Sequence, residues 1–244
     1  MSRAVLVTGA AGAIGQAICH KFMKENWRVI GLDIRKARVT KPGMPLLCAD
    51  LARMVENEAY KWAVMEEIRS LLDGAPINAI VNNAAIQITG RFEDIEVSDW
   101  LLCVSVNLLA PVCLTRMFLD DLIRNGGSVV NMGSIHSQLT KPEFSAYATT
   151  KSALAGLTRA LAVELGDRVA VNIVEPAAVN TGMLIDGLGG ESNLKKVIDK
   201  HPSRSIGDPD LIAEAVYFLG EKGKGYMNGA SLRVDGGIRS RLHE

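Results

Sequence analysis

One stretch near the N-terminus, residues 4–15, constrains the fold of this chain most strongly. An apolar run, Ala4 to Val7, leads into the sequence TGAAGAIG, and a helical pattern follows to about residue 26. A continuous apolar run of this kind is typical of a strand buried on both faces. The turn glycines let the backbone approach a pyrophosphate, and the helix N-terminus adds free N–H groups and a positive dipole end. These glycines are Gly9, Gly12 and Gly15.

Strand patterns then alternate with helical patterns to the end of the chain. Strands are predicted at Arg28–Leu32, Leu46–Ala49, Ile77–Val81, Ser128–Met132, Arg168–Val174 and Ser231–Val234. Helices are predicted at about Leu51–Leu72, Ser98–Arg124, Phe144–Leu165 and Asp208–Gly220. This alternation predicts an α/β fold, a doubly wound parallel sheet with helices on both faces. No break in composition suggests two domains, so a single domain over 1–244 is expected, with the glycine-containing segment 180–205 as a substrate lid.

The net charge and the cysteine content indicate which class of molecule the protein binds and in which cellular compartment it is expected. Twenty-seven basic and 27 acidic residues cancel, so neither a nucleic acid nor an anionic membrane surface is favoured, and a small molecule is expected. The four cysteines lie far apart without CxxC spacing, which indicates reduced thiols, no metal site and a cytoplasmic location. The N-terminal apolar run is too short for a signal sequence, and Leu101–Leu114 is interpreted as a buried helix.

Two acidic residues follow predicted strands. Asp33 ends the second strand, about 20 positions beyond the glycines, where a carboxylate can hold the ribose hydroxyls of adenosine. The alternative for Asp33 is an ordinary turn residue. Asp50 follows the third strand and either accepts a hydrogen bond from the adenine amino group or caps the next helix; the two roles are compatible.

Tyr147 and Lys151 are four residues apart in a predicted helix, so they project from one face. A nearby ammonium favours the phenolate and draws the pKa of the tyrosine toward neutrality, which suits a proton carrier. The alternative is a common surface pair. The helix has almost no polar face, however, which predicts burial on both sides. Ser134 precedes Tyr147 by 13 residues, at a strand end where its hydroxyl is expected to meet the phenol.

Asn107 and Pro111 are both unfavourable inside a helix. Pro111 has no N–H to donate to the carbonyl of Asn107, so this carbonyl needs another partner, most simply water. The carbonyl is a candidate holder of a proton-relay water. The alternative is a helix kink with no further role.

Several motifs follow one another along the chain: TGAAGAIG, Asp33, Asp50, NNAA from Asn82, Asn107, Ser134, Tyr147 with Lys151, Pro176 and VDGG. In this order and spacing they resemble the short-chain dehydrogenase/reductase family, in its single-domain branch, over nearly the whole chain. The resemblance implies a seven-stranded Rossmann-type sheet. It also implies hydride transfer between a nicotinamide cofactor and an alcohol or carbonyl carbon.

The resemblance further implies a role for each matching residue. Tyr147 is the acid/base, Lys151 binds the nicotinamide ribose and lowers the pKa of Tyr147, Ser134 positions the substrate oxygen, and Asn107 holds the relay water. The cofactor would contact Gly9, Gly12, Ile14 and Gly15 at the pyrophosphate, Asp50 and Leu51 at the adenine, Asn83 at the adenosine-side ribose, and Pro176, Val179 and Thr181 at the nicotinamide end.

Two positions depart from the family pattern. The short branch usually has glycine where Ala13 stands, and Gly12 instead gives the GxxGxxG spacing of the longer branch that modifies sugar nucleotides. That branch carries a further C-terminal substrate domain, which 244 residues hardly supply. Ala177 stands where the family usually has glycine after the proline, so the nicotinamide pocket is expected to be narrower by one methyl group.

The leading functional hypothesis is an oxidoreductase acting on a small secondary alcohol or ketone. A redox-neutral epimerase or dehydratase and a catalytically silent dinucleotide-binding regulator are the alternatives. NAD is expected over NADP, because Asp33 would face a 2′-phosphate of like charge. Arg35 and Lys36 oppose this preference, since either could neutralise the phosphate, but they lose more side-chain entropy in doing so.

Substrate and assembly are less constrained. His136, Gln138 and Asn180 are expected to border the pocket beside Val179 and Met183, and their hydrogen-bonding groups favour a sugar or hydroxy acid. His136 is interpreted as a polar wall residue, since no second His or Cys stands at metal-ligand spacing. The apolar helices predict a homo-oligomer, by family resemblance a tetramer.

Overall fold

The computed structural model describes residues 3–35, 44–187, 193–222 and 225–241. Its centre is a sheet of seven strands, with every neighbouring pair parallel. Across the sheet the order is β3 (Leu46–Cys48), β2 (Arg28–Asp33), β1 (Ala4–Thr8), β4 (Ile77–Asn82), β5 (Ser128–Met132), β6 (Ala170–Pro176) and β7 (Ser231–Val234). The chain order reverses between β1 and β4, which is where doubly wound sheets open a ligand crevice at their carboxyl edge.

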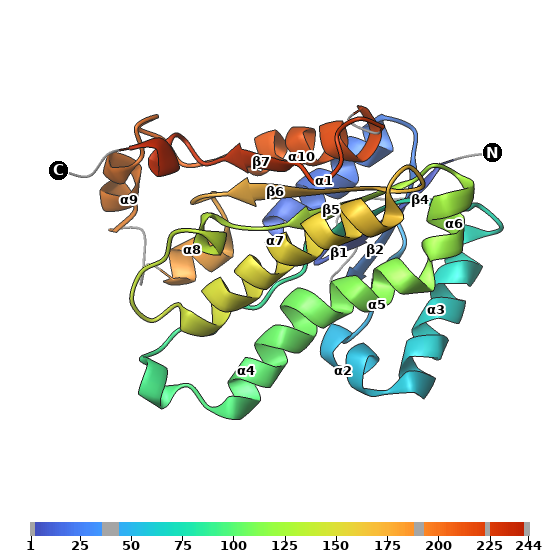
Figure 1. The fold of residues 1–244 in the computed structure, drawn as a ribbon, viewed down its shortest axis with the longest axis horizontal. Coiled ribbons are helices and arrows are strands. Elements are labelled where there is room, and N and C mark those ends of the chain that lie inside the picture. Colours follow the sequence, from blue (N-terminus) through green and yellow to red (C-terminus); the bar gives the residue numbers. More distant parts are fainter. Residues whose placement is uncertain (1–2, 36–43, 188–192, 223–224, 242–244) are drawn as a thin grey trace.

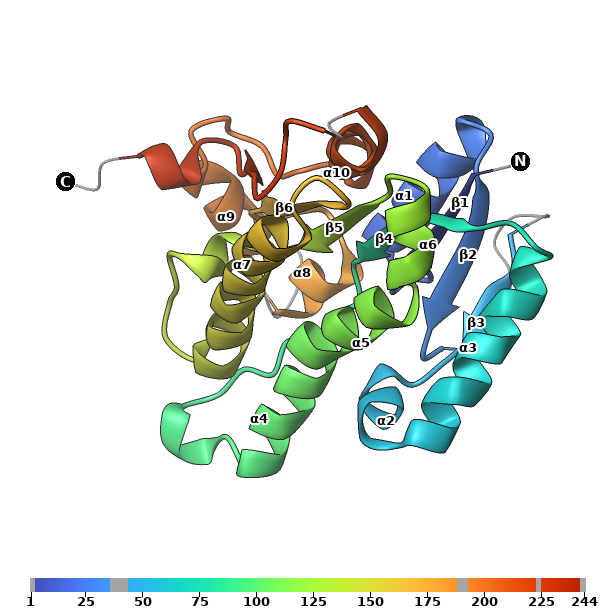
Figure 2. The ribbon, with the colours of Figure 1, turned by 45° about the vertical axis from the view of Figure 1, so that its right-hand side comes forward.

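Helices cover both faces of the sheet (Figures 1 and 2). On one face lie α1 (Ala13–Lys24) and α10 (Pro209–Tyr217), packed on Val5, Val7 and Val81. On the other lie α2 (Leu51–Glu56), α3 (Glu58–Leu72), α4 (Val97–Val104), α5 (Ala110–Met117), α6 (Leu119–Arg124) and α7 (Ser145–Leu165). Alternate strand residues such as Leu6 and Ile80 point into this second core. The central strands β1, β4, β5 and β6 are buried along their whole length because both faces of the sheet are covered there, and the predicted fold class is confirmed.

Two predicted helices are interrupted in the structure. The helix expected over Leu51–Leu72 divides at Asn57, whose side chain caps α3 by accepting the Tyr60 N–H at 2.9 Å. The helix expected from Ser98 begins at Val97, so Ser98 is not its cap. It then widens into a π-turn, η2 (Ser105–Leu109), before α5 and α6. Because Pro111 lacks an N–H, the regular helical ladder is broken at this point.

Segment 180–205 contains α8 (Gly182–Gly187) and α9 (Leu194–Lys200), and residues 188–192 lie outside the described part. Short turns complete the chain: η1 (Phe92–Asp94), η3 (Ile135–Ser137), η5 (Phe218–Lys222) and η6 (Ile238–Ser240). In Figure 1, η6 lies beside α9, near the C-terminus. The last described turn thus lies beside the end of the predicted lid.

By length and composition, the stretch Val97–Met117 is one that could cross a membrane, and 39% of its most apolar window is buried. It packs against α7, α2 and β4, as the helix of a sheet-based fold does. The sequence had predicted a buried helix here, but one side of it is open, with Leu101 62% exposed. On α7 as well, where burial on both sides was predicted, Val163 is 85% exposed.

All four cysteines lie in described parts of the chain, and none forms a disulfide. Within the described residues, no group of three or more His, Cys, Asp or Glu side chains is arranged to hold a metal ion.

Candidate active site

The glycine-rich turn joins β1 to α1 at the carboxyl edge of the sheet. Gly9 has φ +64°, a conformation that favours glycine, and its carbonyl accepts the Gly12 N–H at 3.1 Å. The Asn83 side-chain amide donates to the carbonyls of Thr8 and Gly9 at 2.9 and 3.2 Å. Asn83, predicted to contact the ribose, therefore uses its amide nitrogen to tie the turn to β4.

The turn leaves bare backbone for a ligand. A Cβ at Gly9 would lie 2.9 Å from the Ala84 Cα, and one at Gly15 would lie 2.1 Å from the Gly9 carbonyl oxygen, so both positions need glycine. Gly12 is the N-cap of α1 and has no side chain to occupy the N–H groups of the first helical turn, where Ile14 lies. Such a helix start fits the diphosphate of a dinucleotide. Ala13 is the exposed first residue of α1, where no glycine is required.

We expect Gly15→Ala to weaken NADH binding by at least about 100-fold, because its Cβ forces either α1 or the turn to move. Gly12→Ala is the matched control for the effect of an added Cβ on the fold. Its Cβ would lie 3.4 Å from the Gly9 carbonyl oxygen, and its φ of −77° is an ordinary one. We expect its melting temperature to stay within about 2 °C of the parent. Fluorescence titration with NADH and thermal unfolding provide the measurements. Parent-like NADH affinity in Gly15→Ala would contradict the expectation.

Asp33 is buried at the end of β2, and both of its carboxylate oxygens are engaged. Oδ1 accepts hydrogen bonds from the Arg35 N–H and Nε at 3.0 and 2.9 Å, and Oδ2 accepts from the Ala11 N–H at 2.9 Å and Arg35 Nη2 at 3.2 Å. Burial by itself raises the pKa of Asp33, but the bonds from Arg35 and Ala11 together outweigh it and hold the pKa below its usual value. The Arg35 side chain is 60% exposed, so water is its alternative partner.

Asp50 is the N-cap of α2, as one of its two predicted roles required. Its Oδ1 accepts the N–H groups of Ala52 and Arg53 at 2.9 and 3.1 Å. The Leu51 side chain packs into the core beside α3, so a contact of Leu51 with adenine would come from its backbone. Lys36, the second basic residue considered beside Asp33, lies outside the described residues.

Ser134, Tyr147 and Lys151 converge between β5 and α7. The Ser134 hydroxyl accepts the His136 N–H at 3.2 Å, and it lies near enough to the Tyr147 phenol to lower the pKa of that group. Lys151 is buried, its Nζ donates to the Met132 carbonyl at 2.7 Å, and this nitrogen lies 5.6 Å from the centre of the Tyr147 ring. The alternative of an ordinary surface pair is therefore wrong.

Burial dominates the protonation of this pair in the ligand-free protein. It raises the pKa of Tyr147 to about 12, although the neighbouring Ser134 hydroxyl acts in the opposite direction. Burial lowers the pKa of Lys151 to about 8. The sequence predicted that Lys151 lowers the pKa of Tyr147, but burial outweighs that effect here. The phenolate of Tyr147 and the ammonium of Lys151 both lose hydration when they are buried, so the neutral form of each is favoured.

The Lys151 shift predicts a trade-off between stability and activity. Its pKa when folded lies below the unfolded value of 10.5, so the buried ammonium destabilises the fold below about pH 8. This cost is lost as the pH rises from 8 to 10.5. We expect Lys151→Met to stabilise the fold at pH 7 by about 1–3 kcal/mol, or a few degrees in melting temperature, while activity is lost.

Thermal unfolding of Lys151→Met and the parent at pH 7 and pH 10.5 tests this trade-off. The gain in melting temperature should shrink at the higher pH. Lys195→Met, which replaces an exposed lysine on α9, is the control and should show neither effect. A Lys151→Met variant less stable than the parent at pH 7 would refute the argument.

Asn107 lies within η2, confirming that the helix is disturbed at this residue. Its side chain bridges two segments: Oδ1 accepts the Ile86 N–H at 2.9 Å, and Nδ2 donates to the Ile86 carbonyl and the Thr150 hydroxyl at 3.0 Å each. Thr150 in turn donates to the Tyr147 carbonyl at 2.8 Å. Asn107 therefore connects the loop after β4 to the helix that carries Tyr147 and Lys151. The sequence carries no signal for Thr150, which is one of several threonines in a helix.

Aromatic rings surround Tyr147. His136 stacks on Phe144 with ring centres 4.6 Å apart and meets Tyr147 edge-on at 5.8 Å. Burial, with a smaller contribution from the charge of Lys141, lowers the pKa of His136 to about 4. The imidazole is therefore neutral at physiological pH, and it contacts the Thr140 hydroxyl through Nδ1 at 3.2 Å.

The remaining predicted residues lie along the loops after β5 and β6. Pro176 ends β6, Val179 is buried in a bridge to Gly207, and the Thr181 hydroxyl caps α8 by accepting the Leu184 N–H at 3.2 Å. The side chains of Gln138, Asn180 and Met183 are exposed. Among the described residues, the structure records no contact between these three and Tyr147.

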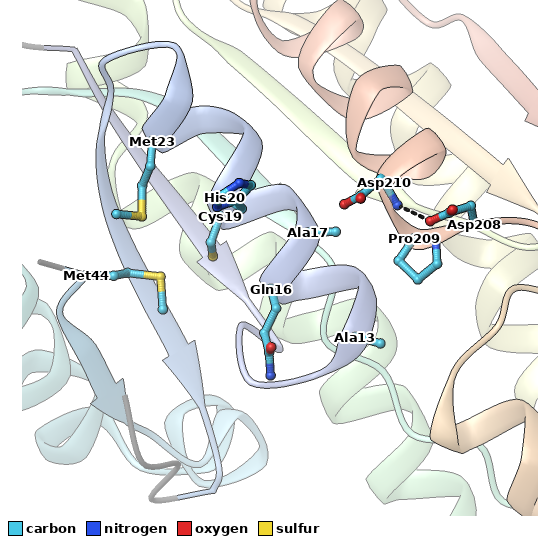
Figure 3. A pocket seen from close by; sticks show the side chains of 10 residues that line it. All are labelled: Ala13, Gln16, Ala17, Cys19, His20, Met23, Met44, Asp208, Pro209 and Asp210. Atoms are coloured by element: carbon cyan, nitrogen blue, oxygen red, sulfur yellow. Dashed lines mark hydrogen bonds between the residues drawn. The ribbon is translucent and has the colours of Figure 1, made fainter. Parts of the chain in front are cut away.

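A hollow of about 440 Å³ lies elsewhere, along α1 and the start of α10 (Figure 3). It begins beside the glycine turn, and its lining includes Gln16, Met23, Met44 and Asp208. Asp208 is already used there, since it accepts the Asp210 N–H at 2.9 Å to cap α10. None of the predicted catalytic residues lines this hollow. The active site is therefore better located by the side chains that converge at Tyr147 than by the position of this hollow.

A parallel sheet with a dinucleotide-type turn and a buried tyrosine, lysine and serine at its carboxyl edge defines a class: nicotinamide-dependent oxidoreductases of alcohols and carbonyls. Comparison with known proteins agrees. The family model described as enoyl-(acyl carrier protein) reductase matches residues 9–239. The chain belongs to the short-chain dehydrogenase/reductase family, and it acts by hydride transfer on CH–OH groups or the corresponding carbonyls.

Several relatives act on sugars or polyols. A galactitol 2-dehydrogenase (L-tagatose-forming) of Cereibacter sphaeroides is 33% identical over 95% of this chain and 92% of its own. An L-xylulose reductase of Bos taurus is 30% identical over 97% of this chain and 96% of its own. The ligand-free aldohexose dehydrogenase of Thermoplasma acidophilum has a TM-score of 0.91, with 28% identity over 100% of this chain and 96% of that one. Solved structures of related proteins contain NADH or NADP, so this chain takes a dinucleotide of the NAD(P) type.

Proposed function

We propose that this protein is an NAD-preferring dehydrogenase of a small polyhydroxylated substrate, a sugar, polyol or hydroxy acid. The observation that carries the proposal is the buried convergence of Ser134, Tyr147 and Lys151, with the serine near enough to affect the pKa of the phenol and Lys151 one helical turn further on. A serine and a tyrosine hydroxyl side by side can hold a substrate oxygen and move its proton.

Each residue has a distinct part in the proposed reaction. Ser134 donates a hydrogen bond to the substrate oxygen and keeps it beside Tyr147. In oxidation the Tyr147 phenolate takes the hydroxyl proton, and in reduction the phenol returns it to the carbonyl oxygen. Lys151 passes protons between Tyr147 and a water held by the Asn107 carbonyl. Hydride acceptance in oxidation, and hydride supply in reduction, would be the chemistry that a bound dinucleotide contributes.

The chain's own residues fit such a dinucleotide. Gly9, Gly12, Ile14 and Gly15 would hold its diphosphate, Asp33 its adenosine ribose, Asp50 and Leu51 its adenine, and Lys151, Pro176, Val179 and Thr181 its nicotinamide half. Asn83 would act by bracing the turn through the carbonyls of Thr8 and Gly9.

The polyhydroxylated substrate is supported by the chemistry beside Tyr147 and by the activities of the relatives. Neutral His136 has one nitrogen at Thr140, and its imidazole can exchange hydrogen bonds with a substrate hydroxyl without contributing a charge. Gln138, Asn180 and Met183 would complete the wall once segment 180–205 closes over the substrate.

A screen of purified protein tests the proposal. Sugars, polyols, hydroxy acids and simple secondary alcohols are each supplied with NAD and with NADP, and reduced nicotinamide is followed by absorbance. Turnover confined to simple alcohols would overturn the substrate class. A dinucleotide that stays bound and never exchanges would favour the redox-neutral epimerase or dehydratase. NADH binding without turnover on any substrate would favour the silent regulator.

We also propose a cytoplasmic homo-oligomer, a tetramer by family resemblance, built from a single domain. Exposed leucines on α4, among them Leu101, form the apolar surface that a second copy would cover. We expect Leu101→Asp to lower the mass in solution, measured by light scattering at micromolar concentration, because it places a charge in that contact. Trp62→Asp, at an exposed apolar position on α3, is the control and should keep the parent mass. A monomeric parent would contradict the proposal.

A further inference from the structure

Glu175 is a buried carboxylate that the proposed hydride and proton transfers do not use. It lies near the end of β6, one residue before Pro176, and is 1% exposed. Oε1 accepts a hydrogen bond from the Ser137 hydroxyl. Oε2 accepts from the Ser231 hydroxyl on β7 and from Arg239 Nη2 at 2.8 Å. A buried charge with this many partners is held in a fixed position.

The cationic partner comes from the last described turn of the chain. The Arg239 side chain, in η6, is 3% exposed, and its Nε also donates to Asp235 Oδ2 at 3.3 Å. Glu175 and Arg239 are 64 residues apart in sequence. Their ion pair therefore fastens the C-terminal segment 235–241 to the sheet near the carboxyl end of β6.

Glu175 also contacts the turn that carries the catalytic serine. Ser137, which donates to Glu175, lies in η3 three residues after Ser134, and its N–H donates to the Ser134 carbonyl at 3.0 Å. The Glu175 Cγ lies 2.9 Å from where a Cβ on Gly133 would stand, so the side chain passes directly over the residue before Ser134. Ser152 on α7 holds the same turn by donating to the Ser137 carbonyl at 2.8 Å.

The C-terminal segment reaches the end of the predicted lid as well. The Ser203 N–H donates to the Gly236 carbonyl at 3.1 Å, and Arg241 Nη1 donates to the Lys200 carbonyl, the last residue of α9, at 3.2 Å. Figure 1 shows η6 beside α9. One segment thus contacts the lid end directly and the Ser134 turn through Glu175.

We propose that Glu175 and Arg239 form a positioning pair: they fix the turn that carries Ser134 and His136 relative to the C-terminal segment and the lid end. Through Ser137, the pair sets where the Ser134 hydroxyl stands beside Tyr147. Disturbing the pair therefore impairs the reaction of bound substrate more than it weakens dinucleotide binding, because the proposed diphosphate, ribose and adenine contacts lie at the glycine turn, Asp33 and Asp50.

Two serines provide a matched test, because each donates one hydroxyl to Glu175 but only one lies on the catalytic turn. Ser137→Ala should lower kcat/KM by about 10- to 100-fold, mostly through kcat, since misplacing a catalytic group by about 1 Å can cost about 100-fold. Ser231→Ala removes the donor on β7 and should stay within about twofold of the parent. Melting temperature and NADH affinity should change equally little in both. Equal kinetic effects of the two variants would overturn the proposal, because a purely structural role predicts them.

A double-mutant cycle separates positioning from stability. If Ser137 acts through Ser134, then Ser137→Ala should cost little further activity in a Ser134→Ala background. The same loss in both backgrounds would show that Ser137 does not act on Ser134. These kinetic measurements rest on the proposed function, because they need a substrate from the screen.

Hydrogen exchange of the ligand-free protein tests the connection independently of any substrate. Arg239→Met alone leaves a buried carboxylate unpaired and is at risk of misfolding, so Glu175→Gln with Arg239→Met is the variant to compare. We expect faster exchange in segment 133–140 as well as in 198–204 and 235–241, with α1 unchanged. Parent-like exchange in 133–140 would show that the C-terminal segment does not hold the catalytic turn, whatever the outcome of the screen.

Discussion

Tyr147→Phe is expected to lower kcat/KM by about 10³-fold, in the middle of the range for general acid–base groups. The change removes the phenolic oxygen that exchanges a proton with the substrate, and little else. The ring keeps its edge contacts with His136 and Phe144 at 5.8 and 6.3 Å. Lys151 keeps its bond to the Met132 carbonyl. NADH affinity should therefore stay within about twofold, measured by fluorescence titration.

Tyr217→Phe is the matched control for this variant. Tyr217 is also a buried tyrosine, on α10, and its hydroxyl donates to Glu25 at 3.3 Å, on the α1 side of the sheet away from Ser134. Its activity should remain within a few-fold of the parent, since the lost hydroxyl affects stability and not chemistry. Turnover of Tyr147→Phe within a few-fold of the parent would remove Tyr147 from the proposed proton route.

Neutralising Asp33 is expected to move cofactor preference toward NADP by about 10- to 100-fold, or about 1.4 kcal/mol for each factor of ten. In the parent, the carboxylate would accept the ribose hydroxyls of NAD and repel the 2′-phosphate of NADP. Asp33→Asn removes the charge and keeps an oxygen for the Ala11 N–H, which Asp33 now accepts at 2.9 Å. The glycine turn should therefore keep its shape, and the measurement is the ratio of kcat/KM with the two cofactors.

Arg35 is expected to determine how far cofactor preference shifts toward NADP in Asp33→Asn. In the ligand-free protein its guanidinium is held on Asp33 by hydrogen bonds through Nε and Nη2. Without the carboxylate, the arginine is released to pair with a phosphate, for which its planar donors are well suited. Arg35→Ala should therefore strengthen the preference for NAD, and the double variant should favour NADP less than Asp33→Asn does. A parent that prefers NADP, or an unchanged ratio in Asp33→Asn, would show that Asp33 does not control the choice.

Much of the fold and part of the site follow from local sequence patterns. The bounds of β5 and β7 agree residue for residue with the sequence prediction. For β5 the reason is that a buried parallel strand is a mostly apolar run with glycine at both ends. Tyr147 and Lys151 are recognisable because helical periodicity puts residues four apart on one face. The disturbance at Asn107 was predictable because proline removes a known hydrogen bond.

Tertiary structure decided the partners of these residues, because the order of strands in the sheet sets which distant segments meet. No local pattern indicates that Asn107 would bridge Ile86 and Thr150, or that Arg35 would be held on Asp33 in place of extending into solvent. The direction of the Tyr147 pKa also depended on burial, which outweighed the effect expected from sequence spacing alone. Glu175 and Arg239, 64 residues apart, meet only because β7 lies beside β6 and the chain then turns back over it. Sequence spacing thus determined which groups are available for chemistry, whereas packing of the sheet and its loops decided where they stand and how strongly they are charged.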